Sequence, residues 1–556
     1  MKLRHLLFGV LAGVAFVACT NDNEPAGVTP VKGADEVAAA PKYMTVNFVT
    51  SDGAATRATA EEENAIESAA FIFFNADGSE QVAKPFIIAK DGNDAVKSTK
   101  YEGYSKKWED TTKAVVVLEN PTEIPASLVV LVNADLKVVL DLAQDADATA
   151  IQDALYGKKL SDLKNIAKDF SAAVKGKFVM SNAVYNDAAG NTIIGAPVDP
   201  ANVCDTPAAA ELSPVKVNVD RVLAKVTVSK KEGLKPESGV EGIEVEIQGW
   251  GLVYENTQSY LIKNLAPSYT TLPASFVWND VTNKRSYWAT AADYSPKKDE
   301  QDNLVGPTFS TLSDIGASLY TQENTEFQTF KEKFAKDETI ENPTAVVVAA
   351  KLKKGNAYPN LYKFAGILYE GEALQTLLAK SAAAKKYFKQ TKAPTETTPA
   401  VYDNFAPDDF TMKEDATAGE SYQANVYLVL PTDKDVYTIE GTTAKKLTAE
   451  EIKTANSDLK DAGETVEFWA GGQTYYYVPI ERVAKNGEET PALLGIVRNH
   501  EYKLTINSIK GLGTAVPDPD QVIIPVTPEK KDYFIAAQIE VLPWKLVEQQ
   551  VNLGEE

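Results

Sequence analysis

The sequence predicts a mainly β protein with a few helices, divided into two or more domains. Short stretches of alternating apolar and polar residues recur along most of the 556 residues, and this two-residue period is typical of half-buried strands. Helical spacing of apolar residues is found in two segments, residues 151–170 and 371–390. A chain of this length exceeds what one hydrophobic core usually organises, so we expect at least two domains.

The N-terminus predicts an export signal. Lys2 and Arg4 precede an apolar run at residues 6–18, which is shorter than the roughly 20 residues that span a bilayer as a helix. The sequence FVAC then places Ala18 before Cys19 and is similar to a bacterial lipobox, although Phe16 stands where leucine is usual. We predict a lipoprotein signal peptide at 1–18 and lipidation of Cys19, since two or three acyl chains anchor firmly. The alternative is an ordinary signal peptide with an incidental cysteine.

A tether, a strand and a loop follow Cys19. Residues 20–42 are small, polar and interrupted by proline, whereas residues 43–49 alternate, with Met44, Val46 and Phe48 on one face. The loop TSDGAATRATAEEE (50–63) places Arg57 among small residues. The chain has six arginines in all, at positions 4, 57, 221, 285, 482 and 498. Because Arg221 and Arg498 fall in predicted strands, Arg57 is the loop arginine that a protease would reach near the N-terminus.

The rest of the chain alternates between strands and turns. The stretch VKVNVDRVLAKVTVS (215–229) predicts one strand whose alternation slips at residues 220–221, which indicates a bulge. Gly, Pro and charged residues together at 230–242 predict the best internal domain boundary. After a proline-rich linker, two strand-like halves at 533–541 and 544–553 flank Pro543, which cannot donate to a sheet. We expect the first half to pair within its own domain and the second half to be the more mobile.

Composition argues against several classes of function. The net charge of −22 disfavours binding to nucleic acid or to anionic membranes. Removal of the signal would leave His500 as the one histidine and Cys204 as the one internal cysteine, so we expect no disulfide, no metal site and no cofactor. We interpret both as structural residues, and we find no phosphate-binding loop, nucleophile elbow or other catalytic motif. The sequence therefore does not predict an enzyme.

Several motifs in a fixed order resemble one family. They are the lipobox, the strand and lone Arg57, FVMSN (178–182), VDRVLAKV (219–226), YYVPI (476–480), VRNHEYKLTINSIKGLG (497–513) and IEVLPWK (539–545). Together they resemble the Bacteroidales fimbrillins, the type V pilins, and most of all the shaft subunit of the short, or minor, fimbriae of Porphyromonas. The resemblance runs the full length and is weakest over 280–470.

The resemblance implies two transthyretin-like β-sandwich domains in tandem, a lipidated outer-membrane precursor, and cleavage between Arg57 and Ala58 by an arginine-specific protease. It also implies polymerisation at the cell surface by donor-strand exchange with other copies of the chain, and association with accessory and anchor fimbrillins. We thus expect a propeptide at 19–57 with a removable strand at 43–49, domains at 58–232 and 233–513, and a linker and donor tail at 514–556. The donor residues expected are Ile539, Val541, Trp544, Val547, Val551 and Leu553.

The predicted function is that of a shaft pilin that supports adhesion and biofilm formation, a virulence trait. Two alternatives remain open at this point. A tip, accessory or anchor fimbrillin would share the fold, although tip subunits of the family tend to lack a donor tail. A surface glycan-binding lipoprotein would keep its N-terminus and would use exposed aromatic residues such as Tyr475 and Tyr477. The N-terminal residue of surface material would separate these classes.

Overall fold

The structure of the chain is a computed structural model. It divides into two compact units, residues 1–39 and 40–556, and everything described below belongs to the second. The described residues are 41–50, 63, 65–91, 95–98, 105–107, 113–171, 177–186, 192–264, 291–292, 297–324, 344–417, 421–483, 493–523, 534–543 and 547–549.

The first part of this unit is built on one ten-stranded sheet. Its order is β5-β4-β3-β2-β7-β9-β13-β1-β6, and β12 pairs with β7. In chain order the strands are β1 (Lys42–Thr50), β2 (Ser68–Phe74), β3 (Phe86–Lys90), β4 (Ala95–Ser98), β5 (Ser105–Lys107), β6 (Lys113–Leu118), β7 (Ser127–Val132), β9 (Met180–Asn182), β12 (Ala196–Pro197) and β13 (Val215–Arg221). A separate pair joins β10 (Tyr185–Asn186) and β11 (Thr192–Ile193).

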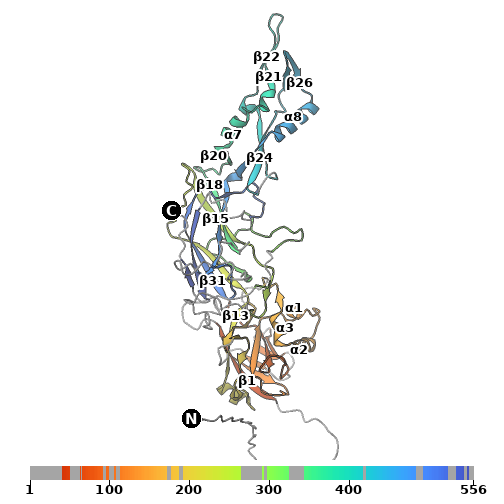
Figure 1. Cartoon of the computed structure of the whole chain (residues 1–556), viewed down its shortest axis with the longest axis vertical. Coiled ribbons are helices and arrows are strands. Elements are labelled where there is room, and N and C mark those ends of the chain that lie inside the picture. The colour runs from red at the N-terminus through yellow and green to blue at the C-terminus, as the bar shows by residue number, and fades with distance from the viewer. Residues whose placement is uncertain are drawn as a thin grey trace, which may run out of the picture. The chain divides into compact units, whose positions relative to one another are not determined.

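This sheet folds over on itself to form a sandwich. One buried cluster unites residues from β1, β6 and β13 with residues from β2, β3 and β7, including Val46, Phe71 and Val217. The other face of β2 and β7 packs against helices (Figure 1), namely α1 (Leu136–Val139), α2 (Ala148–Tyr156) and α3 (Leu160–Lys164). The helices predicted within 151–170 are confirmed as far as Lys164, and Leu155 and Leu163 are fully buried there. The last predicted helical residues are not helical, because Ala167 lies in the short strand β8 (Ala167–Lys168). The short helix α4 (Pro207–Leu212) packs against β1 and β6.

The second part is a sandwich of two sheets. One has the order β17-β14-β31-β33-β34 and the other β15-β18-β28-β32, and their facing residues form one core that includes Val226, Trp250 and Leu504. The strands are β14 (Ala224–Lys230), β15 (Glu244–Val253), β17 (Ser318–Thr321), β18 (Ala345–Lys353), β28 (Gln473–Pro479), β31 (His500–Lys510), β32 (Thr514–Ala515), β33 (Phe534–Pro543) and β34 (Val547–Gln549). Two small pairs accompany them, β16 (Ser259–Tyr260) with β8 (Ala167–Lys168), and β29 (Glu481–Val483) with β30 (Leu493–Leu494).

The predicted single strand at 215–229 is two strands. β13 ends at Arg221 and pairs in the first sheet with β1 and β9, whereas β14 starts at Ala224 and pairs in the second with β17 and β31. The slip in alternation is therefore the crossing from one sheet to the next, and no bulge within one strand is needed. Val222 and Leu223, the two crossing residues, are both buried.

A third set of elements interrupts the second sandwich between β18 and β28. It has the sheets β20-β19-β27-β24-β23 and β22-β21-β25-β26 and a core of its own that includes Leu374, Phe410 and Phe468. The strands are β19 (Leu361–Phe364), β20 (Ile367–Glu370), β21 (Phe388–Lys392), β22 (Val401–Asn404), β23 (Thr411–Asp415), β24 (Gln423–Val429), β25 (Tyr437–Glu440), β26 (Thr443–Lys446) and β27 (Glu464–Trp469), with helices α7 (Gly371–Leu378) and α8 (Ala449–Asp461). The helix predicted across 371–390 thus ends at Leu378, and Phe388 already lies in a strand.

The predicted fold class is confirmed: the chain is mainly β with a few helices and contains two β-sandwiches in tandem. The third core was not predicted as separate from the second sandwich. The reason is physical, since residues 361–469 alternate as other strands do, and only the pairing partners reveal a distinct sheet.

Candidate functional site

Strand β1 lies inside the first sheet, between β6 and β13. It pairs antiparallel with β6, where Met44 stands opposite Val116, and parallel with β13, where Phe48 stands opposite Val217. β6 and β13 therefore each pair with β1 through one of their two backbone edges. Loss of β1 would leave two unpaired edges facing each other across a gap one strand wide, which is a template for another strand.

The three apolar residues predicted to share a face of β1 do so. Met44 and Val46 are 0% exposed and Phe48 is 4% exposed. All three join the core of the first sandwich, and the Phe48 ring lies 5.9 Å from that of Phe71, centroid to centroid. At about 1.5–3 kcal/mol for each buried side chain, they contribute roughly 5–9 kcal/mol before conformational entropy is counted.

The opposite face of β1 is covered as well. The sequence predicts a half-buried strand, yet Thr45 is 0% exposed and Asn47 is half-buried, because α4 packs against β1 and β6. Thr45 Oγ1 and Asn47 Oδ1 are buried and have no hydrogen-bond partner among the described residues. Such unsatisfied polar atoms cost free energy. The apolar face of β1 therefore fits the core well, whereas its polar face leaves two buried oxygens without hydrogen bonds under α4.

The first residues of β1 are held by the loop that carries Cys204. Tyr43 and Cys204 exchange two backbone hydrogen bonds, each 2.8 Å long, and the Lys42 ammonium forms an ion pair with Asp205. The thiol of Cys204 is half-buried, with its Sγ 3.6 Å from the carbonyl oxygen of Ala201. Cys204 thus holds the start of β1 through two backbone hydrogen bonds, in which its thiol takes no part.

The C-terminal strands pair within the second sandwich. β33 runs antiparallel to β31 from the pair His500–Pro543 to the pair Lys510–Phe534, and the described residues of β34 pair with β33 at three positions. Of the predicted donor residues, Ile539 and Val541 lie in β33 and Val547 lies in β34. Trp544, Val551 and Leu553 lie outside the described residues, as do Cys19, Arg57 and Ala58.

Two of the other arginines are enclosed by the protein. Arg221 is 1% exposed at the end of β13, and Arg498 is 0% exposed. The prediction that Arg498 lies in a strand is wrong, because it occupies the turn before β31, where Asn499 adopts a φ of 59°. That left-handed conformation suits asparagine and reverses the chain at this point. Neither arginine offers an extended exposed backbone to a protease.

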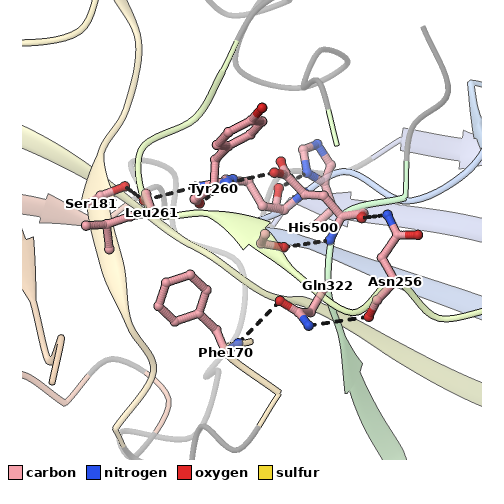
Figure 2. Close-up of polar contacts among 10 residues, drawn as sticks. Phe170, Ser181, Asn256, Tyr260, Leu261, Gln322 and His500 are labelled. Carbon is pink, nitrogen blue, oxygen red and sulfur yellow. Dashed lines mark hydrogen bonds and ion pairs between the residues drawn. The ribbon is translucent and has the colours of Figure 1, made fainter. Parts of the chain in front are cut away.

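Arg498 anchors a polar junction between the two sandwiches (Figure 2). Its guanidinium forms a 2.6 Å ion pair with Glu323, both side chains being fully buried, and donates to the carbonyl oxygens of Tyr260 and Leu261. The Leu261 carbonyl also accepts from the Ser181 hydroxyl, at 2.7 Å, beside β13 in the first sheet. The Gln322 side chain continues the junction by accepting from the Phe170 backbone N–H and donating to the Asn256 carbonyl.

A second polar group of the junction centres on Glu63, the last residue of the stretch 50–63 that contains Arg57. The Glu63 carboxylate accepts from Lys225 Nζ at 2.8 Å and from the Tyr320 hydroxyl at 2.7 Å, and the Arg221 guanidinium donates to its backbone carbonyl. Burial raises the pKa of Glu63, but the hydrogen bonds from Lys225 and Tyr320 outweigh burial and hold that pKa below its usual value. Glu63 therefore stays ionised and fixes the start of the chain after the loop.

The buried ion pair should control the stability of the junction. We expect Glu323→Gln to lower the free energy of unfolding by about 3–5 kcal/mol, because Arg498 stays buried without a counter-charge. Chemical denaturation measures the change. Lys453→Ala, which removes a partner from the exposed Lys453–Glu450 pair of α8, serves as control and should lower stability little. Equal losses in both variants would contradict the assignment.

The described residues were also predicted to include no metal site and a structural His500. No cluster of three metal-ligating side chains occurs in this part of the chain. His500 is buried, and its Nδ1 lies 2.6 Å from the carbonyl oxygen of Arg498, a position within the junction. Among the helices that the structure describes, none is both long and apolar enough to cross a membrane.

Two family models match the chain. Residues 43–221 match the major fimbrial subunit protein FimA, and residues 467–550 match the C-terminal part of fimbrillin, the major fimbrial subunit protein type IV. The chain belongs to the fimbrillins. The first match starts within β1 and ends with β13, so it spans the sheet in which β1 is inserted. This fimbrillin is accordingly a subunit of fimbriae, and its family is one of structural proteins of the cell surface.

Solved structures with similarity to this fimbrillin include three fimbrial proteins. A fimbrilin of Porphyromonas gingivalis W83 is 13% identical, with 92% of this chain and 98% of that chain covered and a TM-score of 0.35. The tip fimbrial protein Mfa3 of Porphyromonas gingivalis, truncated at its C-terminus, is 11% identical over 90% and 99%, with a TM-score of 0.31. A fimbrial assembly protein of Parabacteroides distasonis ATCC 8503 is 14% identical over 72% and 98%, with a TM-score of 0.25. The curated proteins give no match. The family assignment rests on the two family models.

The site differs from the predicted one mainly by what surrounds β1. The sequence pattern predicts the strand and its inward residues, but it does not predict the loop around Cys204, the cover by α4 or the anchor at Glu63. Glu63 is one of three consecutive acidic residues, so its sequence carries no sign that it is buried. The buried pair of Arg498 and Glu323 joins positions far apart in the chain, which no local pattern reports.

Proposed function

We propose that this fimbrillin is the shaft subunit of a cell-surface fimbrium and polymerises by donor-strand exchange. The observation that carries the proposal is the position of β1, an inserted strand between β6 and β13 that is followed in the sequence by the loop with Arg57. The precursor is exported as a lipoprotein acylated at Cys19 and carried to the outer membrane. An arginine-specific protease then cuts between Arg57 and Ala58, and the fibre supports adhesion and biofilm formation.

The uncut chain keeps its own groove filled. While β1 is covalently attached, its loss requires only a local opening from which it returns at once. A cut after Arg57 makes the strand a separate fragment, which can diffuse away after it leaves. The roughly 5–9 kcal/mol from its three apolar side chains then has to be supplied by another strand, and this favours exchange over an empty groove.

The replacing strand is the C-terminal tail of another copy. Within that tail β33 is the less suitable donor, because its pairing with β31 closes the sheet of its own sandwich. After Pro543 the described residues that pair at home are the three of β34, and the whole tail follows a proline-rich linker. Val547, Val551 and Leu553 share one parity, as do Met44, Val46 and Phe48. Donation from head to tail does not close on itself, so it yields a filament.

N-terminal sequencing of purified surface fibres tests the proposal directly. We expect the mature subunit to begin at Ala58, because the residues before the cut leave with β1. A subunit that begins at lipidated Cys19 would instead indicate an anchor fimbrillin or a retained lipoprotein with a binding function, and the proposal would then fail. The uncut precursor, isolated from a strain without arginine-specific protease activity, is the control and should retain Cys19.

A further inference from the structure

The segment 199–213, between β12 and β13, is a compact unit that packs on β1. It contains a 3₁₀ turn (Pro200–Asn202) and α4, which begin after the N-caps Asp199 and Thr206. Asn202 Nδ2 donates to the carbonyl oxygen of Ser213 at 3.0 Å and so ties one end of the segment to the other. Because these bonds are internal, the segment can move as one piece without unfolding.

The segment reaches β1 at two places. At the first residues of the strand, Tyr43 and Cys204 share two backbone hydrogen bonds and Lys42 pairs with Asp205. Further along, α4 packs over the outer face of the strand, and Ala210 is the α4 residue that is fully buried. Val203 adds a partly buried contact with the core of the sandwich. Most other residues of 199–213 are exposed, so its inward contacts are concentrated on β1 and its surroundings.

We propose that residues 199–213 form a latch that holds β1 in its groove and sets the rate at which the strand leaves. The inference rests on the proposed function, since it concerns the same strand. A cut after Arg57 frees the end of β1 at Thr50, whereas the latch binds the opposite end at Lys42 and Tyr43. The strand therefore opens first at the cut end, and the latch contacts are the last to break.

The buried polar atoms on the covered face fit this role. Thr45 Oγ1 and Asn47 Oδ1 have no hydrogen-bond partner among the described residues, so closing the cover over them is costly. The latch thus covers a strand whose two buried oxygens lack hydrogen bonds. When the latch opens, both oxygens can bind water. The same segment can then close on the strand of the next subunit, because backbone pairing of the kind made by Cys204 does not depend on the side chain opposite.

Weakening the latch should speed the release of β1. The test uses the full-length chain with Cys19→Ser, cut at Arg57 by an arginine-specific protease, and follows the loss of the N-terminal fragment by size-exclusion chromatography. Asp205→Ala with Thr206→Ala removes the ion pair and the cap of α4. We expect release to become faster by about 2- to 20-fold, as losses of an exposed ion pair and a helix cap would give.

The matched control removes the same kinds of contact elsewhere in the first sandwich. Asp141→Ala with Asp147→Ala breaks the ion pair of Lys168 with Asp141 and the cap of α2, neither of which touches β1. Release from this variant should stay within about twofold of the parent. A release rate that is unchanged in the latch variant, or raised equally in both variants, would overturn the latch.

A disulfide separates the latch from the proposed function. Tyr43 and Cys204 face each other as a hydrogen-bonded antiparallel pair, in which the Cα atoms lie about 5.5 Å apart and within the range of a disulfide. Tyr43→Cys, once mass spectrometry confirms the bond to Cys204, should hold the fragment after the cut and stop polymerisation until a reductant is added. Tyr43→Ser under the same oxidising conditions should polymerise. Fibres from the oxidised Tyr43→Cys chain would contradict strand exchange itself, whereas a block there with unchanged release in the latch variant would contradict the latch alone.

Discussion

Arg57→Ala is expected to abolish fibre formation and leave export and folding intact. The substitution changes one residue after β1 and leaves the residues that pair with β1 in β6 and β13 unchanged, so we expect the strand to stay in the groove as it does in the parent. Without the cut, β1 remains attached and returns to the groove faster than a strand from another copy can enter. Ladders of oligomers on unheated gels, which report polymerisation, should fall to background, and surface material should retain Cys19.

Two further variants show whether the cut or the charge matters. Arg57→Lys keeps the positive charge but removes the arginine that the protease requires, and we expect it to behave like Arg57→Ala. A chain in which the loop carries the recognition site of a different protease should stay monomeric until that protease is added, and then polymerise. Ladders from the Arg57→Ala chain with an intact N-terminus would refute maturation at this residue, whatever the other variants do.

Strand β1 could be predicted from the sequence because the pattern that marks it is local. Met44, Val46 and Phe48 alternate with polar residues, and alternation needs no knowledge of the partner strands. The neighbours of β1 could not be predicted in the same way. Its parallel partner, β13, lies far along the chain, and no local signal specifies which of several valine-rich stretches pairs with it.

The crossing at Val222 and Leu223 shows the same limit. The sequence reports a slip in alternation, and a bulge and a change of sheet produce the same slip. Only the pairing of β14 with β31 distinguishes them. Helix α8 was missed for another reason, since its apolar residues are few, although Thr448 and Glu451 form a capping box that marks its start.

The junction lay beyond prediction because its charges are buried. The sequence around Arg498 and around Glu323 has the pattern of ordinary strands and turns. Charged residues are rarely buried, so nothing in such a pattern predicts that these two are. Arg498 nonetheless joins the turn before β31 to the carbonyl oxygens of Tyr260 and Leu261, and the Leu261 carbonyl in turn accepts from Ser181 of the first sheet.

Deleting the residues after Pro543 is expected to stop polymerisation while the subunit still folds. The deletion removes β34 but keeps all of β33, whose pairing with β31 closes the second sandwich. The truncated chain, once cut at Arg57, would keep an acceptor groove between β6 and β13 and have no strand to donate. It should therefore be monomeric by size-exclusion chromatography. Mixed with the full-length chain, it should accept one donor and terminate the fibre, which shortens the ladders.

The residues of the tail point alternately to opposite faces, so substitutions on one face can be controlled by substitutions on the other. Val547, Val551 and Leu553 replaced together by serine should reduce ladders to background, because the groove that held Met44, Val46 and Phe48 would lose its apolar side chains. Serine at Glu548, Gln550 and Asn552 alters as many residues of the same segment on the opposite parity, and it should leave the ladders within about twofold of the parent. Normal fibres from the truncated chain would show that the donor lies elsewhere. An inverted result of the two serine variants would show that the tail enters the groove with its other face toward the core, since a shift of one residue exchanges the two faces of a strand.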